Sequence, residues 1–144
     1  MLNTDSVFHS RYLPPDVLNQ VLKEYTELEK IGRSVEGRPI YALRLGRGSM
    51  KLLAWSQMHG NESTTTRGLF DFYVQIRDDE HCLSQFTFVF IFQLNPDGSQ
   101  AYTRNNANQV DLNRDALAQS QPETQAFMKL LNDFDPDLCF NLHD

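Results

Sequence analysis

The segment at residues 86–94 constrains the fold of this chain more than any other. It consists almost entirely of aromatic and β-branched residues, and an Asn-Pro-Asp-Gly turn at residues 95–98 follows it. Its apolar residues do not alternate regularly with polar ones, which is typical of a strand covered on both faces. We therefore predict a central strand between two layers of other elements.

Strands and helices alternate along the rest of the chain. Apolar runs and a glycine-containing turn predict strands at residues 30–35, 39–45, 51–56, 86–94 and 137–142. Apolar residues spaced by three and four predict helices at about 15–29, 63–77 and 122–132. This order predicts an α/β fold, a three-layer sandwich around a mixed, mostly parallel sheet, with the first two strands as a hairpin at its edge.

Size and composition predict one soluble domain over residues 1–144. The chain is 40% hydrophobic and 22% charged, and its formal net charge is −6 without a cluster of basic residues. We therefore expect neither nucleic acid nor a membrane as a partner. The first residues lack the features of a secretory signal, so a cytoplasmic location is expected. Cys82 and Cys139 exclude a disulfide framework, and Cys139 is expected to be free and buried in its apolar run.

A His-x-x-Glu pair, His59 and Glu62, lies where the predicted strand at 51–56 meets the helix at 63–77. The glycine and asparagine between them allow a sharp turn. By itself the pair is a weak signal, because a chain of this composition contains roughly 0.15 such pairs by chance and a polar loop corner would look the same. Its position matters more, because ligands in such sheets gather at the carboxyl ends of strands.

A third candidate ligand, His143, follows the predicted strand at 137–142. Alone, such a histidine is more often packed or solvated than a ligand. Two histidines and one carboxylate, however, form the usual ligand set of a catalytic zinc site with an open fourth position. His9 and His81 lie in a polar N-terminal arm and a charged helix end, and we do not include them.

The polar stretch at residues 99–120 is long for a structureless connection, and such loops are often functional. It contains Arg104 and Arg114 among several amides. Arginine presents a planar, permanently charged fork that suits a carboxylate or a developing oxyanion. The alternative for this stretch is a solvated surface loop.

In identity and order, these motifs resemble those of the zinc carboxypeptidases, the carboxypeptidase A-like metallopeptidases of peptidase family M14. The motifs are His59-Gly60-Asn61-Glu62, Asn95-Pro96-Asp97-Gly98, Arg104, Val110-Asp111-Leu112-Asn113-Arg114-Asp115 and Leu142-His143-Asp144. The match covers the chain from about Ser34 onward. The resemblance implies the zinc-carboxypeptidase, phosphorylase/hydrolase-like fold and hydrolysis of C-terminal peptide bonds by a zinc-activated water.

The resemblance also implies roles for individual residues. His59, Glu62 and His143 would bind one Zn²⁺, and Asp111 would orient His59. Arg104 would polarise the scissile carbonyl and stabilise the oxyanion.

Asn113 and Arg114 would hold the terminal carboxylate of the substrate, so peptide or protein C-termini are the expected partners. Asn61 departs from digestive members, which have an arginine there.

The family also needs a general-base glutamate and a tyrosine, which normally lie well downstream of the third ligand. The sequence ends at Asp144, one residue after that ligand. We therefore expect the N-terminal half of a single catalytic domain, with incomplete zinc binding, little activity and an exposed strand edge that promotes association.

Two alternatives stay open. One is an N-acyl amino acid deacylase of the same superfamily, although the Asn-Pro-Asp-Gly turn favours a peptidase. The other is a non-catalytic module that binds peptide C-termini through Asn113 and Arg114.

Overall fold

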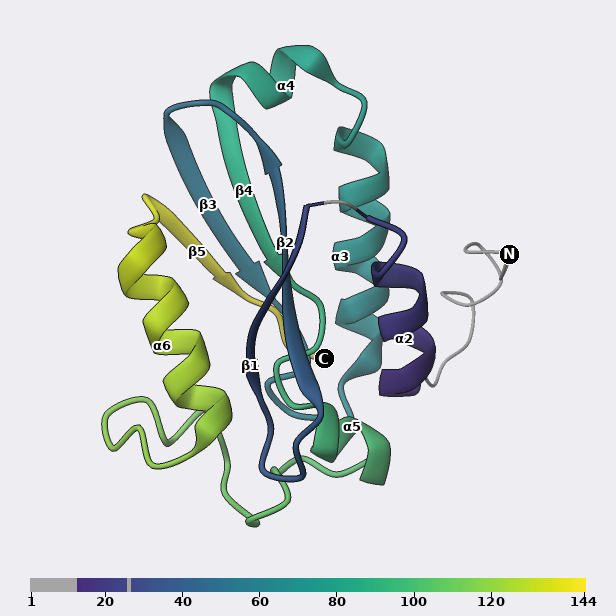
Figure 1. Ribbon diagram of the computed structural model, residues 1–144, viewed down its shortest axis with the longest axis vertical. Coiled ribbons are helices and arrows are strands. Elements are labelled where there is room, and N and C mark those ends of the chain that lie inside the picture. The colour runs from purple at the N-terminus through teal and green to yellow at the C-terminus, as the bar shows by residue number, and fades with distance from the viewer. Residues whose placement is uncertain (1–12, 26) are drawn as a thin grey trace.

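The computed structural model describes residues 13–25 and 27–144 (Figure 1). The strands are β1 (Leu28–Arg33), β2 (Pro39–Gly46), β3 (Met50–Trp55), β4 (Phe86–Ile91) and β5 (Leu138–Asn141). The helices are α2 (Pro15–Leu22), α3 (Ser63–Ile76), α4 (Glu80–Gln85), α5 (Pro96–Ala101) and α6 (Pro122–Phe134).

The five strands form one mixed sheet in the order β1-β2-β4-β3-β5. β2 is antiparallel to both β1 and β4, whereas β3 is parallel to both β4 and β5. Four strands therefore run in one direction and β2 runs against them. The predicted α/β fold, its edge hairpin and the central position of the strand that begins at Phe86 are confirmed.

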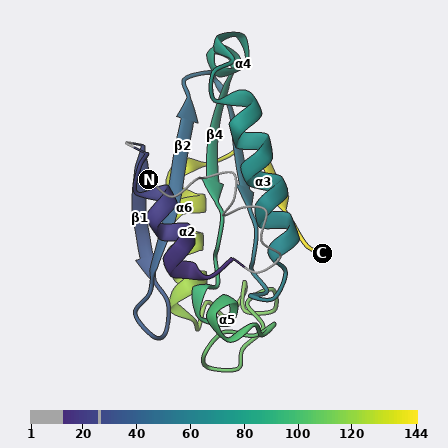
Figure 2. The ribbon, with the colours of Figure 1, turned by 90° about the vertical axis from the view of Figure 1, so that its right-hand side faces the viewer.

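Helices cover both faces of the sheet, with α2 and α3 on one side and α6 on the other (Figures 1 and 2). Alternate residues of β4 enter different cores. Phe88 and Phe90 pack in the cluster that includes α2 and α3, whereas Val89 and Ile91 pack in the cluster that includes α6. This explains why residues 86–94 are apolar without alternation, since a strand between two helical layers has no solvated face.

The first predicted helix is too long. α2 ends at Leu22, and β1 begins at Leu28, inside the range predicted as helical. Leu28 pairs with Leu43 of β2, so the hydrogen bonds of the sheet replace those of a longer helix. Tyr25 and Leu28 still pack against the same core as α2, which accounts for their helix-like spacing in the sequence.

Two short helices lie where turns or solvent-exposed runs were expected. Asp79 starts α4, and its side chain accepts a hydrogen bond from the Cys82 amide. Asn95 starts α5 in the same way by accepting from the Gly98 amide, with Pro96 at the first helical position. Both are ordinary helix starts.

The prediction that Cys139 is buried is wrong. Cys139 is exposed, as are the other residues of β5. β5 is an edge strand, paired only with β3, so its apolar residues lack the cover that β4 receives. An apolar groove of about 440 Å³ lies beside it and is lined by residues that include Leu52, Phe72 and Phe140.

No helix in the described part of the chain is long and apolar enough to cross a membrane.

Candidate active site

The predicted metal ligands come from two neighbouring strands. His59 and Glu62 lie in the corner between the end of β3 and the start of α3, and His143 lies just beyond β5. Because β3 and β5 are parallel, with Trp55 beside Asn141, their carboxyl ends meet at the same edge of the sheet. The sheet thus brings together residues that are 81 positions apart in the sequence.

The three side chains form one cluster with Glu62 between the histidines. Oε1 of Glu62 lies 2.8 Å from Nδ1 of His59, and Oε2 lies 2.7 Å from Nδ1 of His143. One potential ligand atom from each residue lies within 4.8 Å of the others. Two imidazole nitrogens and a carboxylate oxygen are the donor set that catalytic zinc prefers, so the residues fit this ion.

Burial falls across the cluster from His59 to His143. The His59 side chain is 2% exposed, that of Glu62 is 14% exposed and that of His143 is 32% exposed. The cluster is therefore anchored on the β3 side and reaches solvent on the β5 side.

Asp111 lies behind His59. Its Oδ1 is 3.0 Å from Nε2 of His59, so the ring has Nδ1 toward Glu62 and Nε2 toward Asp111. Asp111 also accepts hydrogen bonds from the Asn113 amide and from Nε of Arg104. Partial burial opposes ionisation of Asp111, but its hydrogen bonds to His59, Asn113 and Arg104 outweigh burial and lower its pKa.

Arg104 lies beside the cluster and is half exposed. Its guanidinium is 3.1 Å from Asp111 and 3.8 Å from Glu62. Asn113 and Arg114 lie two and three residues after Asp111, in a turn that the Arg114 amide closes by donating to the Asp111 carbonyl. Asn113 is half-buried and Arg114 is exposed.

A buried support beneath the His59 corner was not predicted. Asn95 donates to the carbonyls of Met58 and Arg104, and the Gly60 amide also donates to Arg104. Gly60 packs so closely on α5 that a Cβ atom there would lie 2.0 Å from the carbonyl carbon of Gly98. The signal for Asn95 was present in the Asn-Pro-Asp-Gly motif, which we interpreted as a turn and as a motif of the family without assigning Asn95 a supporting role.

A second set of buried polar residues in and after the polar stretch was also missed: Asn106, Asp115, Gln121 and Glu123. Asp115 accepts from the amides of Ser120 and Gln121. Burial of the Asp115 carboxyl opposes ionisation, yet hydrogen bonding, first from Ser120, lowers its pKa. The polar stretch is therefore anchored to the fold by these buried polar groups, although many of its other residues are exposed to solvent.

Comparison with known proteins identifies the family of this chain. The profile of a protein family described as zinc carboxypeptidase matches residues 16–144. The chain belongs to the zinc carboxypeptidase family. Carboxypeptidase SOL1 of Arabidopsis thaliana is 30% identical over 162 residues, a match that covers 92% of this chain and 33% of that protein. This zinc carboxypeptidase chain thus spans about a third of the length of that curated relative.

Solved structures show the same zinc carboxypeptidase fold. A metallo-carboxypeptidase from Pseudomonas aeruginosa superposes with a TM-score of 0.76 at 26% identity, covering 92% of this chain and 40% of that one. The murein-tripeptide amidase MpaA from Escherichia coli O157 has a TM-score of 0.60 at 24% identity, covering 83% of this chain and 62% of that one. Because MpaA is only 24% identical, its similarity to this chain shows a shared fold and nothing more.

Proposed function

We propose that residues 1–144 are the N-terminal portion of a single zinc carboxypeptidase domain that, when complete, hydrolyses C-terminal peptide bonds. The observation that carries this proposal is the convergence of His59, Glu62 and His143, with Asp111 behind His59. A single Zn²⁺ held by these three ligands would supply Lewis acidity and activate a water molecule. Family membership supports the same assignment.

In this proposal Asp111 and Arg104 serve the reacting centre in different ways. Asp111 holds the His59 ring with Nδ1 toward the ligand cluster, and such partners of ligating histidines strengthen metal binding. Arg104 stabilises negative charge on the scissile carbonyl oxygen. A lost donor of this kind typically costs about 10² to 10³ in rate.

Asn113 and Arg114 would select the chain end. A guanidinium can bind a carboxylate through two parallel hydrogen bonds, and Arg114 is exposed at the loop that also carries Asp111. Peptide or protein C-termini are therefore the proposed substrates.

The zinc carboxypeptidases that this chain resembles use a further glutamate for proton transfer, besides the carboxylates that the cluster already uses. Glu62 contacts both histidines, and Asp111 contacts His59 and Arg104. Glu123 is fully buried, where it accepts from the Val35 amide. We therefore propose that the 144-residue chain alone has little peptidase activity. Robust release of C-terminal amino acids by the purified chain would contradict this.

Metal analysis of the purified chain tests the site. We expect up to about one zinc ion per chain, and loss of that zinc in His59→Ala, because the variant removes the most buried ligand. His81→Ala removes an exposed histidine on α4 and is the matched control, so its zinc content should equal that of the unchanged protein. A zinc content that is indifferent to His59→Ala would exclude the proposed site.

The non-catalytic alternative makes a different prediction. A module that binds C-termini would retain a peptide with a free carboxylate and release the same peptide after amidation, without hydrolysing either one. The deacylase alternative predicts faster hydrolysis of an N-acyl amino acid than of a peptide when the same assays are run on a longer chain that has activity.

A further inference from the structure

Asn106 is the buried residue of the loop that runs from Arg104 to Asp111. It is 1% exposed, although the loop around it consists mainly of polar, partly exposed residues. Its side-chain Oδ1 accepts from the amides of Asn108 and Val110 at 3.1 and 3.0 Å. Its backbone amide donates to the Val110 carbonyl at 3.0 Å. Asn106 thus closes the turn that immediately precedes Asp111.

The amide nitrogen of the same side chain fastens this turn to the body of the fold. Nδ2 of Asn106 lies 2.8 Å from Oε1 of Gln121 and 3.2 Å from Oε2 of Glu123. Gln121 and Glu123 begin α6, and Glu123 is fully buried. The other oxygen of Glu123 accepts from the Val35 amide in the β1–β2 turn at 3.1 Å.

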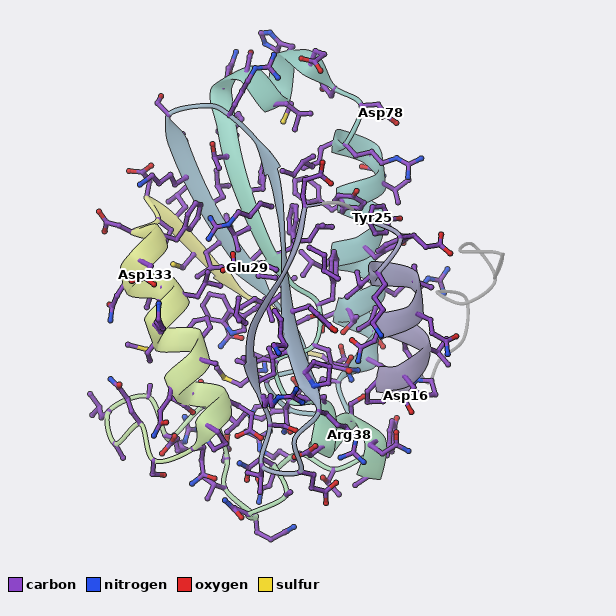
Figure 3. The ribbon with its side chains drawn as sticks, in the orientation of Figure 1. Asp16, Tyr25, Glu29, Arg38, Asp78 and Asp133 are labelled. Carbon is purple, nitrogen blue, oxygen red and sulfur yellow. The ribbon has the colours of Figure 1, made fainter. Side chains whose placement is uncertain are left out.

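The β1–β2 turn is held from a second side as well. Asp97 of α5 accepts from the Ser34 hydroxyl, from the Glu36 amide and from Arg38, which lies at this turn beside α5 (Figure 3). The loop, α6 and the hairpin are thus joined by buried polar groups that all have partners. Such a network stabilises the fold only when every member has a partner, because a buried polar group without one costs about 1–3 kcal/mol of stability.

Asp111 depends on this network for its position. Its distance of 3.0 Å from Nε2 of His59 must be kept by a segment that has no helix or strand of its own. The turn at Asn106 is fixed to α6 on the side of the loop that leads into Asp111. A side chain that orients a metal ligand is effective only when its own position is fixed.

We infer that Asn106 is a positioning residue, which acts with Glu123 to hold Asp111 against His59 and thereby sets the metal affinity of the site. The inference deepens the proposed function and rests on it for the zinc measurement. Asn106 does not touch the ligand cluster. Its effect is transmitted through the loop and through Asp111.

The test compares two adjacent asparagines. Asn106→Ala removes the bonds that fix the turn to α6 as well as the two bonds from loop amides to Oδ1, whereas Asn105→Ala removes one bond, to the Gln109 carbonyl, within the loop. Zinc affinity is measured by competition with a chromophoric chelator. We expect Asn106→Ala to weaken zinc binding by at least about tenfold, and Asn105→Ala to change it by less than about twofold.

A double-mutant cycle separates positioning from general destabilisation. If Asn106 acts through Asp111, Asn106→Ala should have almost no further effect on zinc affinity in the Asp111→Asn background. If the two substitutions instead weaken zinc affinity independently, so that their fold-changes multiply in the double variant, the inference is wrong. Glu123→Gln is the milder second variant in case Asn106→Ala does not fold, because it keeps an acceptor for Val35 and places an amide group opposite Asn106.

The position of Asp111 can also be measured in the metal-free protein, without relying on zinc binding. The ¹⁵N chemical shift of His59 Nε2 reports its hydrogen bond to Asp111, and it should change in Asn106→Ala and in Glu123→Gln but not in Asn105→Ala. An unchanged shift in folded variants would refute the inference. Absence of zinc binding by the unchanged protein, with the shift altered as expected, would instead refute the proposed function alone.

Discussion

Glu123 is a fully buried residue whose ionisation is coupled to folding. Burial raises the pKa of its carboxyl above the ordinary 4.5, although hydrogen bonds from its surroundings act in the opposite direction. A folded molecule therefore keeps this proton at pH values where the unfolded chain has released it. Stability from this group is complete below pH 4.5 and is lost as the pH rises through the raised folded-state pKa.

The predicted outcome is a difference in pH dependence between the unchanged protein and Glu123→Gln. As the pH rises from about 4.5, the free energy of unfolding of the unchanged protein should fall relative to that of the variant. Chemical denaturation at a series of pH values measures this. Glu80→Gln, which alters a solvent-exposed ion pair with Arg47, is the control and should leave the profile unchanged. Parallel profiles for Glu123→Gln and the unchanged protein would show that Glu123 is not the coupled group.

At the scale of elements, the position of the metal ligands depends on how closely the His59 corner approaches α5. Gly60 is buried, and a Cβ atom there would meet backbone atoms of Gly98 and Ser99 at 2.0–2.5 Å. Backbone atoms cannot rotate away as a flexible side chain can. A larger residue must therefore push the corner away from α5 and displace His59 with it.

Gly60→Ala and Gly68→Ala form a matched pair that tests this contact. Gly68 lies in α3, where a Cβ atom would meet nothing within 4 Å. We expect Gly60→Ala to destabilise the protein by about 1–3 kcal/mol and to weaken zinc binding, because overpacking forces the backbone to shift. Gly68→Ala should stabilise it by about 0.5–1 kcal/mol, because alanine favours a helix interior. Equal stability of the two variants in urea would contradict the close approach.

At the scale of the whole molecule, the exposed edge at β5 favours association. Leu138 and Phe140 are 48% and 47% exposed on a strand that is paired on one side only. Unpaired strand edges with apolar side chains promote pairing with other chains, and a charged residue on the edge prevents it. The groove beside β5 adds further apolar surface.

Leu138→Lys should reduce self-association in sedimentation velocity at micromolar concentration. Leu117→Lys makes the same chemical change at a leucine that is 99% exposed but lies outside any strand, so it should have little effect. If exposure of an apolar side chain were sufficient, Leu117→Lys would have the larger effect. That outcome would exclude the β5 edge as the cause.

The elements with a strong local signal were predictable from the sequence alone. The strand that begins at Phe86 was predicted from its continuous run of aromatic and β-branched residues, and the helix that begins at Ser63 from apolar residues that repeat with the helical period. The spacing of His59 and Glu62 placed both in one corner, and the parallel sheet made convergence with His143 a reasonable expectation.

The features that depend on distant neighbours were decided only by the tertiary structure. Pairing with β2 turned Leu28 from the end of a helix into the start of a strand. The edge position of β5 left Cys139 exposed in an apolar run that resembles a buried strand. Polar residues such as Asn106 and Glu123 became buried because each found partners on another element. Local sequence fixes periodicity and turn chemistry, whereas burial and pairing depend on which segments come to lie beside each residue.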